Sequence, residues 1–316
     1  MPTKGLPEAV LIEALNLAEE YGSAHLAVKA GATKLSRETL RTRINTALRS
    51  NLRPTFRKDK ARVYERERIG KMHLVIPDTQ VKPGVCVDHM DWVGNYIIEK
   101  KPNVIVHIGD HWDMPSLSRY DKGKLPFEGR RYVLDVKAGR DAMERLLKPI
   151  ADYNRTAHEK YNPEMHFCMG NHEIRISRLI DDNAEYQGKF DLADLGIEEY
   201  GWKVHDYLKP VKIDGIKYCH FFTSGTLGKA VTSAAMMLKN EEGSATMGHV
   251  QHYDVAIQKK SGQRGVFAAT CYLHDEHYLG YQGNNQRRHI LVKHEVNEGV
   301  YDLMEVSLAF LKKAYS

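Results

Sequence analysis

Five groups of polar residues in this sequence carry side chains that commonly bind metal ions. In chain order they are Asp78-Thr-Gln80, Gly109-Asp110-His-Trp-Asp113, Gly170-Asn171-His172-Glu173, His220 and Gly248-His249-Val-Gln251-His252. Carboxylate and amide oxygens together with imidazole nitrogens suit divalent ions such as Mn²⁺, Fe²⁺ or Zn²⁺. Taken singly, each group has an ordinary explanation, because Gly-Asp often forms a turn and a lone histidine is often a hydrogen-bonded core residue. Taken together, the groups predict a metal centre.

The elements that must position these groups are predicted to be strands. Residues 71–78, 103–110 and 164–171 are apolar runs that end in Asp78, Asp110 and Asn171. Residues 87–100 and 133–160 have helical spacing, the second with an interruption expected at Pro149. This βαβαβ order predicts a sheet whose carboxyl-end edge carries the site. Further strands are predicted at 211–222, 244–249, 254–259, 265–270, 289–294 and 300–306.

The order and spacing of the polar groups resemble those of the calcineurin-like metallophosphoesterases. The pattern of that family is D-x-H, G-D-x-x-D, G-N-H-[D/E], a single His and then G-H-x-H. The resemblance covers roughly residues 71–260 and is carried above all by "GDHWD" and "GNHE". It implies an α/β fold of calcineurin-like type, in which a β-sandwich is flanked by helices, and a hydrolase that acts on phosphoesters.

The resemblance also implies a role for each matched residue. Asp110 would bridge two divalent ions, Asp78 would bind the first, and the second would be completed by Asn171, His220 and His249. Mn²⁺ is the first choice for both ions, with Mg²⁺, Fe²⁺ or Zn²⁺ as alternatives. His172 occupies the position of the catalytic histidine, which stabilises the phosphate or protonates the leaving oxygen, and Glu173 or Asp113 would orient it.

Two positions depart from the family pattern, and both concern the first ion. Gln80 stands where the pattern has the histidine of D-x-H, and Gln251 stands at the last histidine of G-H-x-H, with His252 one position late. An amide oxygen is a weaker and harder ligand than imidazole. Three outcomes are open: a weak or Mg²⁺/Mn²⁺-selective first site, a bulge that brings His252 inward, or loss of the first ion and of activity.

Two other segments have weaker signals. Arg175, just after "GNHE", is expected either near a substrate phosphate or on the exposed face of a helix. "SGTLGKA", at residues 224–230, lacks the G-x-x-x-x-G-K-[ST] spacing of a nucleotide-binding loop and is expected to cap a helix beginning near Lys229.

The excess positive charge of the chain is confined to its first fifth. Residues 1–70 contain 14 Lys and Arg against 8 Asp and Glu, whereas residues 71–316 contain 32 against 33. Within the first segment, residues 29–68 contain 13 basic and 4 acidic side chains. This density is typical of a module that faces a polyanion, although a charge run also suits a solvated surface.

The basic segment has the pattern of three short helices. They are predicted at 6–21, 24–30 and 37–49, the last two capped by Ser23 and Ser36. On the third, Leu40, Ile44, Ala47 and Leu48 share one face, and the residues opposite suit phosphates and base edges. The segment resembles a helix-turn-helix; the alternative is a helical docking or oligomerisation module. The predicted DNA-contacting residues are Thr39, Thr42, Arg43, Asn45, Thr46 and Arg49.

Together these patterns predict a domain order and a function. Residues 1–50 form a helix-turn-helix domain, 51–70 a charged linker and 71–316 a metallophosphoesterase domain. The predicted function is metal-dependent cleavage of DNA phosphodiesters by a dinuclear site and a metal-activated water, and the layout resembles bacteriophage metallophosphoesterases and, distantly, DNA-repair nucleases. The alternatives are a phosphomonoesterase or cyclic-nucleotide phosphodiesterase with a partner-binding N-terminal module, and a DNA-binding protein with a degenerate metal site.

Composition excludes several other classes of protein. With 42% hydrophobic and 28% charged residues among 316, the chain is far from disordered or fibrous sequences. No apolar run approaches the roughly 20 residues that cross a bilayer, and Glu8 interrupts the segment where a signal peptide would be apolar. Its four cysteines form no C-x-x-C pair. We therefore expect no membrane association and a cytoplasmic location, that of a bacterial host if the protein is phage-encoded.

Overall fold

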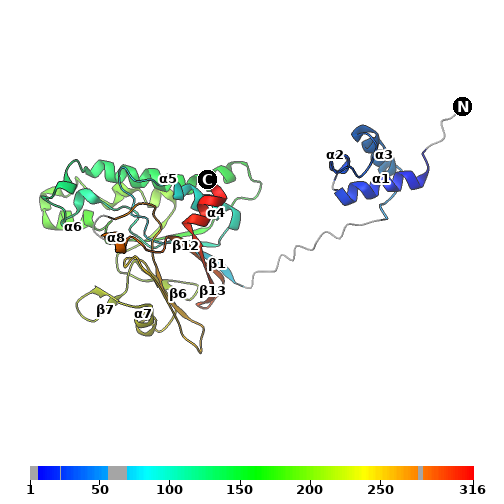
Figure 1. Ribbon diagram of the computed structural model, residues 1–316. Coiled ribbons are helices and arrows are strands. Elements are labelled where there is room, and N and C mark those ends of the chain that lie inside the picture. The colour runs from blue at the N-terminus through cyan, green and yellow to red at the C-terminus, as the bar shows by residue number, and fades with distance from the viewer. Residues whose placement is uncertain (1–5, 22, 56–69, 277–279) are drawn as a thin grey trace. The chain divides into compact units, whose positions relative to one another are not determined.

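The computed structural model describes residues 6–21, 23–55, 70–276 and 280–316. The chain divides into two compact units, Met1–Glu67 and Arg68–Ser316, and both are drawn in Figure 1. Most of the predicted linker, residues 56–69, lies outside the described residues. In the part of the chain that the structure describes, no helix combines the length and the apolar character needed to span a membrane.

The first unit contains three helices at the predicted places. They are α1 (Glu8–Tyr21), α2 (Ala24–Lys29) and α3 (Arg37–Arg49). Both predicted N-caps are confirmed, because the hydroxyl of Ser23 accepts the backbone N–H of Leu26 at 3.2 Å and that of Ser36 accepts the N–H of Thr39 at 3.1 Å. Each cap satisfies a donor that the first turn of a helix leaves unpaired.

Leucine and alanine side chains hold the three helices together. Two adjoining clusters form the core, and their buried members are Leu11, Ala14, Leu15, Ala27, Leu40 and Ala47. The prediction that Leu48 joins this core is wrong, since its side chain is 52% exposed. Successive residues of an α-helix are about 100° apart, so Leu48 turns away from the face on which Ala47 is buried.

The second unit is built on two large sheets. The six-stranded sheet has the order β13-β12-β1-β2-β3-β4, the five-stranded sheet has the order β10-β11-β9-β6-β5, and β7 pairs with β8 in a small hairpin. The strands of the first sheet are β1 (Lys71–Ile76), β2 (Val104–His107), β3 (Glu164–Cys168), β4 (Lys203–His205), β12 (His289–Asn297) and β13 (Val300–Ser307). The remaining strands are β5 (Val211–Ile213), β6 (Ile216–Tyr218), β7 (Thr223–Ser224), β8 (Lys229–Ala230), β9 (Ala245–Met247), β10 (Tyr253–Ile257) and β11 (Arg264–Ala268).

Parallel pairing brings several strand ends to one edge. Strands β1, β2, β3 and β4 are parallel neighbours, and in the other sheet β9 runs parallel to both β6 and β11. The connections β1-α4-β2 and β2-α5-β3 are the predicted βαβαβ progression, through α4 (Asp88–Lys100) and α5 (Tyr132–Thr156). In such sheets the loops after the carboxyl ends of the strands form the binding site.

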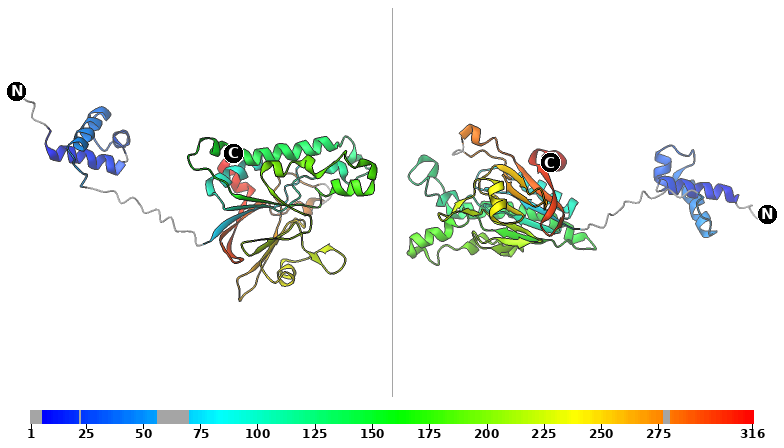
Figure 2. Two further views of the ribbon diagram at one scale, coloured as in Figure 1. Left: turned by 180° about the vertical axis from the view of Figure 1, so that it is seen from behind. Right: turned by 90° about the horizontal axis from the view of Figure 1, so that it is seen from below.

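Alternate residues of each strand enter two different cores. On β1, Val75 faces the five-stranded sheet and packs with Tyr218 and Val266, whereas Leu74 and Ile76 pack under the helices. Figures 1 and 2 show α4, α5 and the C-terminal helix α9 (Leu308–Tyr315) gathered on one side of the six-stranded sheet. The predicted α/β architecture, two facing sheets flanked by helices, is confirmed.

The interruption predicted at Pro149 is wrong, because α5 continues through this residue to Thr156. Proline costs a helix one hydrogen bond, which packing can offset. Gly94 of α4 allows that packing: a Cβ atom there would lie 2.4 Å from the carbonyl oxygen of Leu146 and 2.9 Å from Cγ of Pro149. Helix α4 therefore packs directly against the turn of α5 that ends at the proline.

Two predictions for the second half are also corrected. No helix begins near Lys229; this residue lies in β8, and α7 (Ala234–Asn240) begins later, capped by the hydroxyl of Ser233. The strand predicted at 211–222 is a hairpin of β5 and β6, because the chain turns at Asp214 and Gly215, both with positive φ.

The other helical segments are α6 (Arg175–Asp182), α8 (Gly280–Gly283), η1 (Pro115–Leu117), η2 (Leu125–Phe127), η3 (Ala184–Tyr186), η4 (Leu192–Leu195) and η5 (Glu198–Tyr200).

Candidate metal centre

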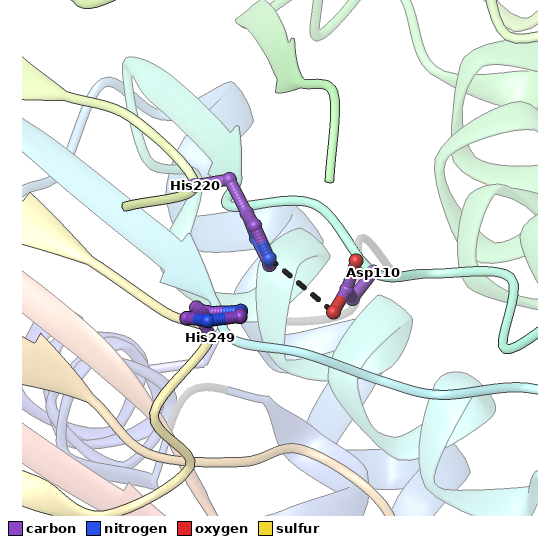
Figure 3. A group of neighbouring side chains, drawn as sticks. All are labelled: Asp110, His220 and His249. Atoms are coloured by element: carbon purple, nitrogen blue, oxygen red, sulfur yellow. Dashed lines mark ion pairs between the residues drawn. The ribbon is translucent and has the colours of Figure 1, made fainter. Parts of the chain in front are cut away.

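The predicted ligands follow the ends of strands from both sheets. Asp78, Asp110 and Asn171 come shortly after β1, β2 and β3, and His220 and His249 come after β6 and β9. Figure 3 shows side chains from three of these loops, Asp110, His220 and His249, directed toward one another. Residues far apart in the sequence therefore meet where the two sheets end.

Three of these side chains form a compact set of ligand atoms. One ligand atom from each of Asp110, His220 and His249 lies within 4.8 Å of the others. Oδ2 of Asp110 is 3.3 Å from Nε2 of His220, while Oδ1 of Asn171 is 2.9 Å from the same nitrogen and 2.7 Å from Nδ1 of His249. This is a mixed oxygen and nitrogen set of the kind that borderline divalent ions bind.

The orientation of His220 suits a ligand to a cation. Its Nδ1 is 3.0 Å from the carbonyl oxygen of Ile108, a partner that fixes a donor proton on that nitrogen and directs Nε2 toward Asp110 and Asn171. Burial lowers the pKa of His220, but the nearby carboxylates of Asp110 and Asp78 outweigh it and raise this pKa to about 9. A divalent cation would satisfy the same oxygens and leave the imidazole neutral.

His249 has a different electrostatic environment. Burial, followed by the charge of His220, lowers its pKa to about 4, so its imidazole is neutral near pH 7. Its ring stacks on that of Phe221, with the centroids 4.5 Å apart. A neutral, oriented imidazole is the form that binds a metal.

Asp78 is fully buried beside this set. Both of its carboxylate oxygens accept the backbone N–H of His249, at 3.2 and 3.1 Å, and burial raises its pKa. Gly248 makes this approach possible, since a Cβ atom there would lie 2.1 Å from Oδ1 of Asp78. The glycine of the G-H motif is therefore needed to seat the carboxylate of another strand end.

Gln80 carries a buried amide group that the described protein atoms leave without a hydrogen bond. Its side chain is fully buried, and neither amide atom has a hydrogen-bond partner among the described residues. An unsatisfied buried polar group costs about 1–3 kcal/mol. A cation held with Asp78 would use the amide oxygen, so the residues present fit a divalent ion here.

Gln251 and His252 are placed differently. Gln251 is buried, and its amide oxygen accepts the hydroxyl of Tyr272 at 3.1 Å. His252 is exposed, its ring lies 5.4 Å from that of Phe267, and it is not part of the three-residue set found in the described chain. The structure thus seats Gln251 in the interior and leaves the neighbouring imidazole outside.

We expect two bound ions of unequal affinity, because amide oxygens replace two imidazoles at the first site. Calorimetric titration with Mn²⁺ should resolve a tighter and a looser ion, and Gln80→His should tighten the looser one. Gln187→His, on an exposed residue, is the matched control and should change neither affinity. If His252 is a ligand, His252→Ala should remove the looser ion. Two equally tight ions, unaffected by Gln80→Ala and Gln251→Ala, would contradict amide ligation.

His172 lies beside the metal set with its ring held on two sides. Nδ1 is 2.8 Å from Oδ1 of Asp113, and Nε2 is 3.1 Å from Nη2 of Arg175 and 3.8 Å from Oδ2 of Asp110. Burial lowers the pKa of His172, but Asp110 and Asp113 outweigh it, and the pKa is raised above its ordinary value. In this arrangement Nδ1 donates to Asp113 and Nε2 accepts from the guanidinium of Arg175, so the raised pKa places a second proton on Nε2 only when Arg175 takes another partner.

Asp113, rather than Glu173, contacts the ring of His172. The carboxylate of Glu173 instead accepts three backbone N–H groups, those of Asp110 at 3.0 Å, Gly170 at 2.9 Å and Trp112 at 3.0 Å. It therefore ties the loop after β2 to the loop after β3. Glu173 therefore stabilises the two loops that carry Asp110 and Asn171, whereas Asp113 is the residue that contacts the ring of His172.

Two residues that the sequence did not single out complete this network. Nζ of Lys82 is 3.0 Å from Oδ2 of Asp113 and 2.6 Å from Oε1 of Glu276. Burial raises the pKa of Asp113, but its bond to His172 and the charge of Lys82 outweigh that and hold the pKa well below its ordinary value. No local spacing connects Glu276 with a motif near residue 113, which is why sequence patterns missed it.

Arg175 is partly buried at the edge of the same site. Its guanidinium donates to the carbonyl oxygens of Asp113 at 2.8 Å and Met114 at 3.2 Å. Arg175 is therefore not on the exposed face of a helix but beside His172 and Asp113, and its expected place near a substrate phosphate stays a prediction.

The predicted DNA-contacting residues occupy one side of α3 in the other unit. Arg43 is partly exposed, and the other five are exposed: Thr39, Thr42, Asn45, Thr46 and Arg49. The hydroxyls of Thr42 and Thr46 donate to carbonyl oxygens one turn back, at 2.9 Å each. These threonines therefore present methyl groups and acceptor lone pairs beside the arginines.

Comparison with known proteins gives only distant structural similarity. No protein-family model matches the chain, and no curated protein does. Similar solved structures include Vps29 from Entamoeba histolytica complexed with Zn²⁺, at 10% identity and a TM-score of 0.33, covering 75% of this chain and 99% of that one. Another is a conserved uncharacterized protein from Streptococcus pneumoniae described as a predicted phosphoesterase, at 9% identity and a TM-score of 0.25, covering 74% and 97%. Similarity at this level assigns no family, so we base the function on the residues of the site.

Proposed function

We propose that the second unit is a calcineurin-like metallophosphoesterase that hydrolyses phosphodiesters in DNA. The observation that supports it most directly is the convergence of Asp110, His220 and His249 within 4.8 Å, beside the ion pair of His172 and Asp113. A metal-ligand set next to a buried, protonatable imidazole is what hydrolysis of a phosphoester requires.

The residues divide into two sets of ligands. Asp78, Gln80 and Gln251 would hold the first ion, Asn171, His220 and His249 the second, and Asp110 both. Such ions, with Mn²⁺ the first choice, supply a more acidic water and neutralise charge on the phosphate. Chelation with EDTA should therefore stop turnover, and added Mn²⁺ should restore it.

His172 and Arg175 act on the substrate itself in this proposal. In the structure Nε2 of His172 accepts from Nη2 of Arg175 at 3.1 Å; once Arg175 pairs with the phosphate instead, Nε2 would carry a proton and give it to the leaving oxygen, while the bond between Nδ1 and Asp113 holds the ring. Arg175, whose guanidinium lies 3.1 Å from the same imidazole, would pair with a non-bridging phosphate oxygen.

The first unit supports DNA as the substrate. Its basic charge and the polar face of α3 suit a helix-turn-helix that contacts phosphates and bases. A DNA-binding module in the same chain raises the local DNA concentration at the site, which assists a nuclease and not a hydrolase of small nucleotides.

Turnover assays with Mn²⁺ on labelled DNA, bis-p-nitrophenyl phosphate and p-nitrophenyl phosphate test this function. We expect cleavage of DNA and of the chromogenic diester. Turnover of the monoester alone would favour a phosphomonoesterase, and hydrolysis of cyclic nucleotides without DNA cleavage a cyclic-nucleotide phosphodiesterase. DNA binding with no turnover would indicate a degenerate metal site.

Removal of residues 1–67 should weaken DNA binding while the chromogenic diester is still hydrolysed. The excess charge and the polar face of α3 lie in this unit, whereas all proposed metal ligands lie beyond it. We expect the Kd for duplex DNA, measured by fluorescence anisotropy, to rise at least about tenfold. The slope of log Kd against log salt concentration should also become shallower, by about 1 for each phosphate that the shortened protein no longer neutralises.

The full-length double variant Arg43→Ala/Arg49→Ala provides a second measurement of the same effect. It should also weaken DNA binding, and Arg155→Ala on an exposed arginine of α5 is its matched control. Equal affinity of the intact and shortened proteins for DNA would refute the helix-turn-helix proposal.

A further inference from the structure

A second set of side chains lines the cleft beyond the metal centre. The cleft has a volume of about 950 Å³ and reaches from Asn171, His172 and His249 to residues 115–135. This is close to the upper end of the roughly 300–1,000 Å³ typical of pockets for small molecules. One phosphodiester group fills a small part of it, so a substrate that occupies the whole cleft extends well away from the metal ligands.

One wall of the cleft, which we name the Tyr120 wall, is formed by residues 115–131 between β2 and α5. Arg130 ties this segment together, because its Nη1 donates to the carbonyl oxygen of Pro115 at 2.9 Å and to Oδ2 of Asp121 at 2.7 Å. Its guanidinium also lies over the ring of Phe127, 5.8 Å from the centroid. The wall thus has a defined shape supported by its own side chains.

Of the groups that lack an ion pair in the described chain, the Tyr120 wall has more exposed cations than exposed carboxylates. Lys124 and Arg131 line the cleft, are exposed and have no ion pair within the described residues. The lining carboxylates are mostly engaged: Asp113 and Glu276 with Lys82, Asp121 with Arg130, Asp275 with Arg288 and Asp135 with the N–H of Ser116, while exposed Glu128 has no ion pair in that same part of the chain. Among these exposed lining groups without an ion pair, two are cations and one is a carboxylate, and buried Asp135 accepts a backbone N–H.

Tyr120 adds an open aromatic surface to these charges. Its side chain is 84% exposed although it lines the cleft, and no ring contact or hydrogen bond of its side chain occurs among the residues that the structure describes. Aromatic side chains usually bury most of their surface, so a free ring in a charged cleft is unusual. A free ring and two exposed cations that line the same cleft are the groups that single-stranded nucleic acid uses, the ring for a base and the cations for phosphates.

We propose that the Tyr120 wall binds an unpaired nucleotide next to the scissile phosphate, so that the enzyme acts on single-stranded DNA or single-stranded ends. A base would stack on Tyr120 while Lys124 and Arg131 pair with neighbouring phosphates. A duplex is excluded from this arrangement, because its bases are already stacked on one another. The inference rests on the proposed nuclease function for its substrate and adds the strand state that this function prefers.

Photo-crosslinking tests the contact without requiring turnover. The full-length protein is irradiated with a short single-stranded oligonucleotide that contains 5-iodouracil, and the joined peptide is identified by mass spectrometry. We expect crosslinks within residues 115–131, abolished in Tyr120→Ala and restored in Tyr120→Phe, which keeps the ring. Crosslinks found only outside the Tyr120 wall would overturn the inference even if the protein cleaves DNA.

Kinetics provide the second measurement. Tyr120→Ala should raise KM for the single-stranded oligonucleotide roughly 5- to 150-fold, the range of one base stack, and by much less for bis-p-nitrophenyl phosphate, which is too short to reach the wall. Lys124→Ala should act in the same direction, and Lys313→Ala, on an exposed lysine of α9 outside the Tyr120 wall, is its matched control. Equal KM values for the parent and Tyr120→Ala would overturn the inference and leave the proposed hydrolase intact. Crosslinking at Tyr120 with no hydrolysis of any diester would instead overturn the hydrolase and retain the binding site.

Discussion

Asp110→Ala should reduce metal-dependent hydrolysis of bis-p-nitrophenyl phosphate to the rate measured in EDTA, a loss of about 10³-fold or more. Asp110 is the proposed bridge, so its removal takes a ligand from both ions and a negative charge from a fully buried site. Metal ions supply several kcal/mol of transition-state stabilisation, and each 1.36 kcal/mol is a factor of ten in rate. Elemental analysis should show loss of both ions together with the loss of turnover.

Two further variants separate this effect from misfolding. In the parent, Oδ1 of Asp110 accepts the backbone N–H of His172 at 2.9 Å, and Asp110→Asn keeps this acceptor while it removes the negative charge. This variant should therefore fold as the parent does but, like Asp110→Ala, be inactive. Asp302→Ala, on an exposed aspartate of β13, should change neither metal content nor rate. Parental turnover in a correctly folded Asp110→Ala would show that the two-metal proposal is wrong.

The framework of the site was predictable because local sequence decides where strands end. Strands β1, β2 and β3 are short and mostly buried, and shortly after each comes one of the polar residues that meet: Asp78, Asp110 and Asn171. Parallel pairing then follows from the helices between the strands. No long-range information is needed to place these three side chains at one edge.

The contributions of the second sheet are harder to derive from the sequence. His220 and His249 follow strands of only three residues, too short to show clear alternation, and the resemblance to a family pattern selected them. Lys82 and Glu276 show the same limit, since 194 positions separate the two partners of this ion pair. Only the folded chain shows that this pair supports Asp113.

Local rules failed where tertiary packing outweighed them. Pro149 should break a helix by its missing N–H, yet α4 packs against α5 closely enough to keep it continuous. The segment at 224–230 has the glycines of a helix-capping loop but forms the β7–β8 hairpin, whose turn uses Gly225 and Gly228 at positive φ. In both segments, contacts with neighbouring elements determine a conformation that differs from the local preference of the residues.

His172→Ala should lower kcat by roughly 10²–10⁴ while metal content stays nearly unchanged, because a positioned acid–base group contributes a factor of this size. Nε2 of its ring is 3.8 Å from Oδ2 of Asp110, the proposed bridge, and His172 is not one of the proposed ligands, so its removal takes no ligand from the ions. Asp113→Asn should produce a smaller loss in kcat, because the ring remains but its orienting carboxylate is neutralised. His158→Ala, on an exposed histidine, is the matched control.

The combination of metal content and kcat gives each outcome a distinct meaning for His172. If His172→Ala loses an ion as well as activity, this histidine is a ligand and the leaving oxygen takes its proton from elsewhere. If metal and kcat are both unchanged, the imidazole has no part in the reaction, despite lying between Asp113 and Arg175. A loss confined to kcat, with a parental KM for bis-p-nitrophenyl phosphate, is the pattern expected of a group that acts only in the transition state. We expect that pattern, because the contacts of His172 direct Nε2 toward the metal ligands without making it one of them.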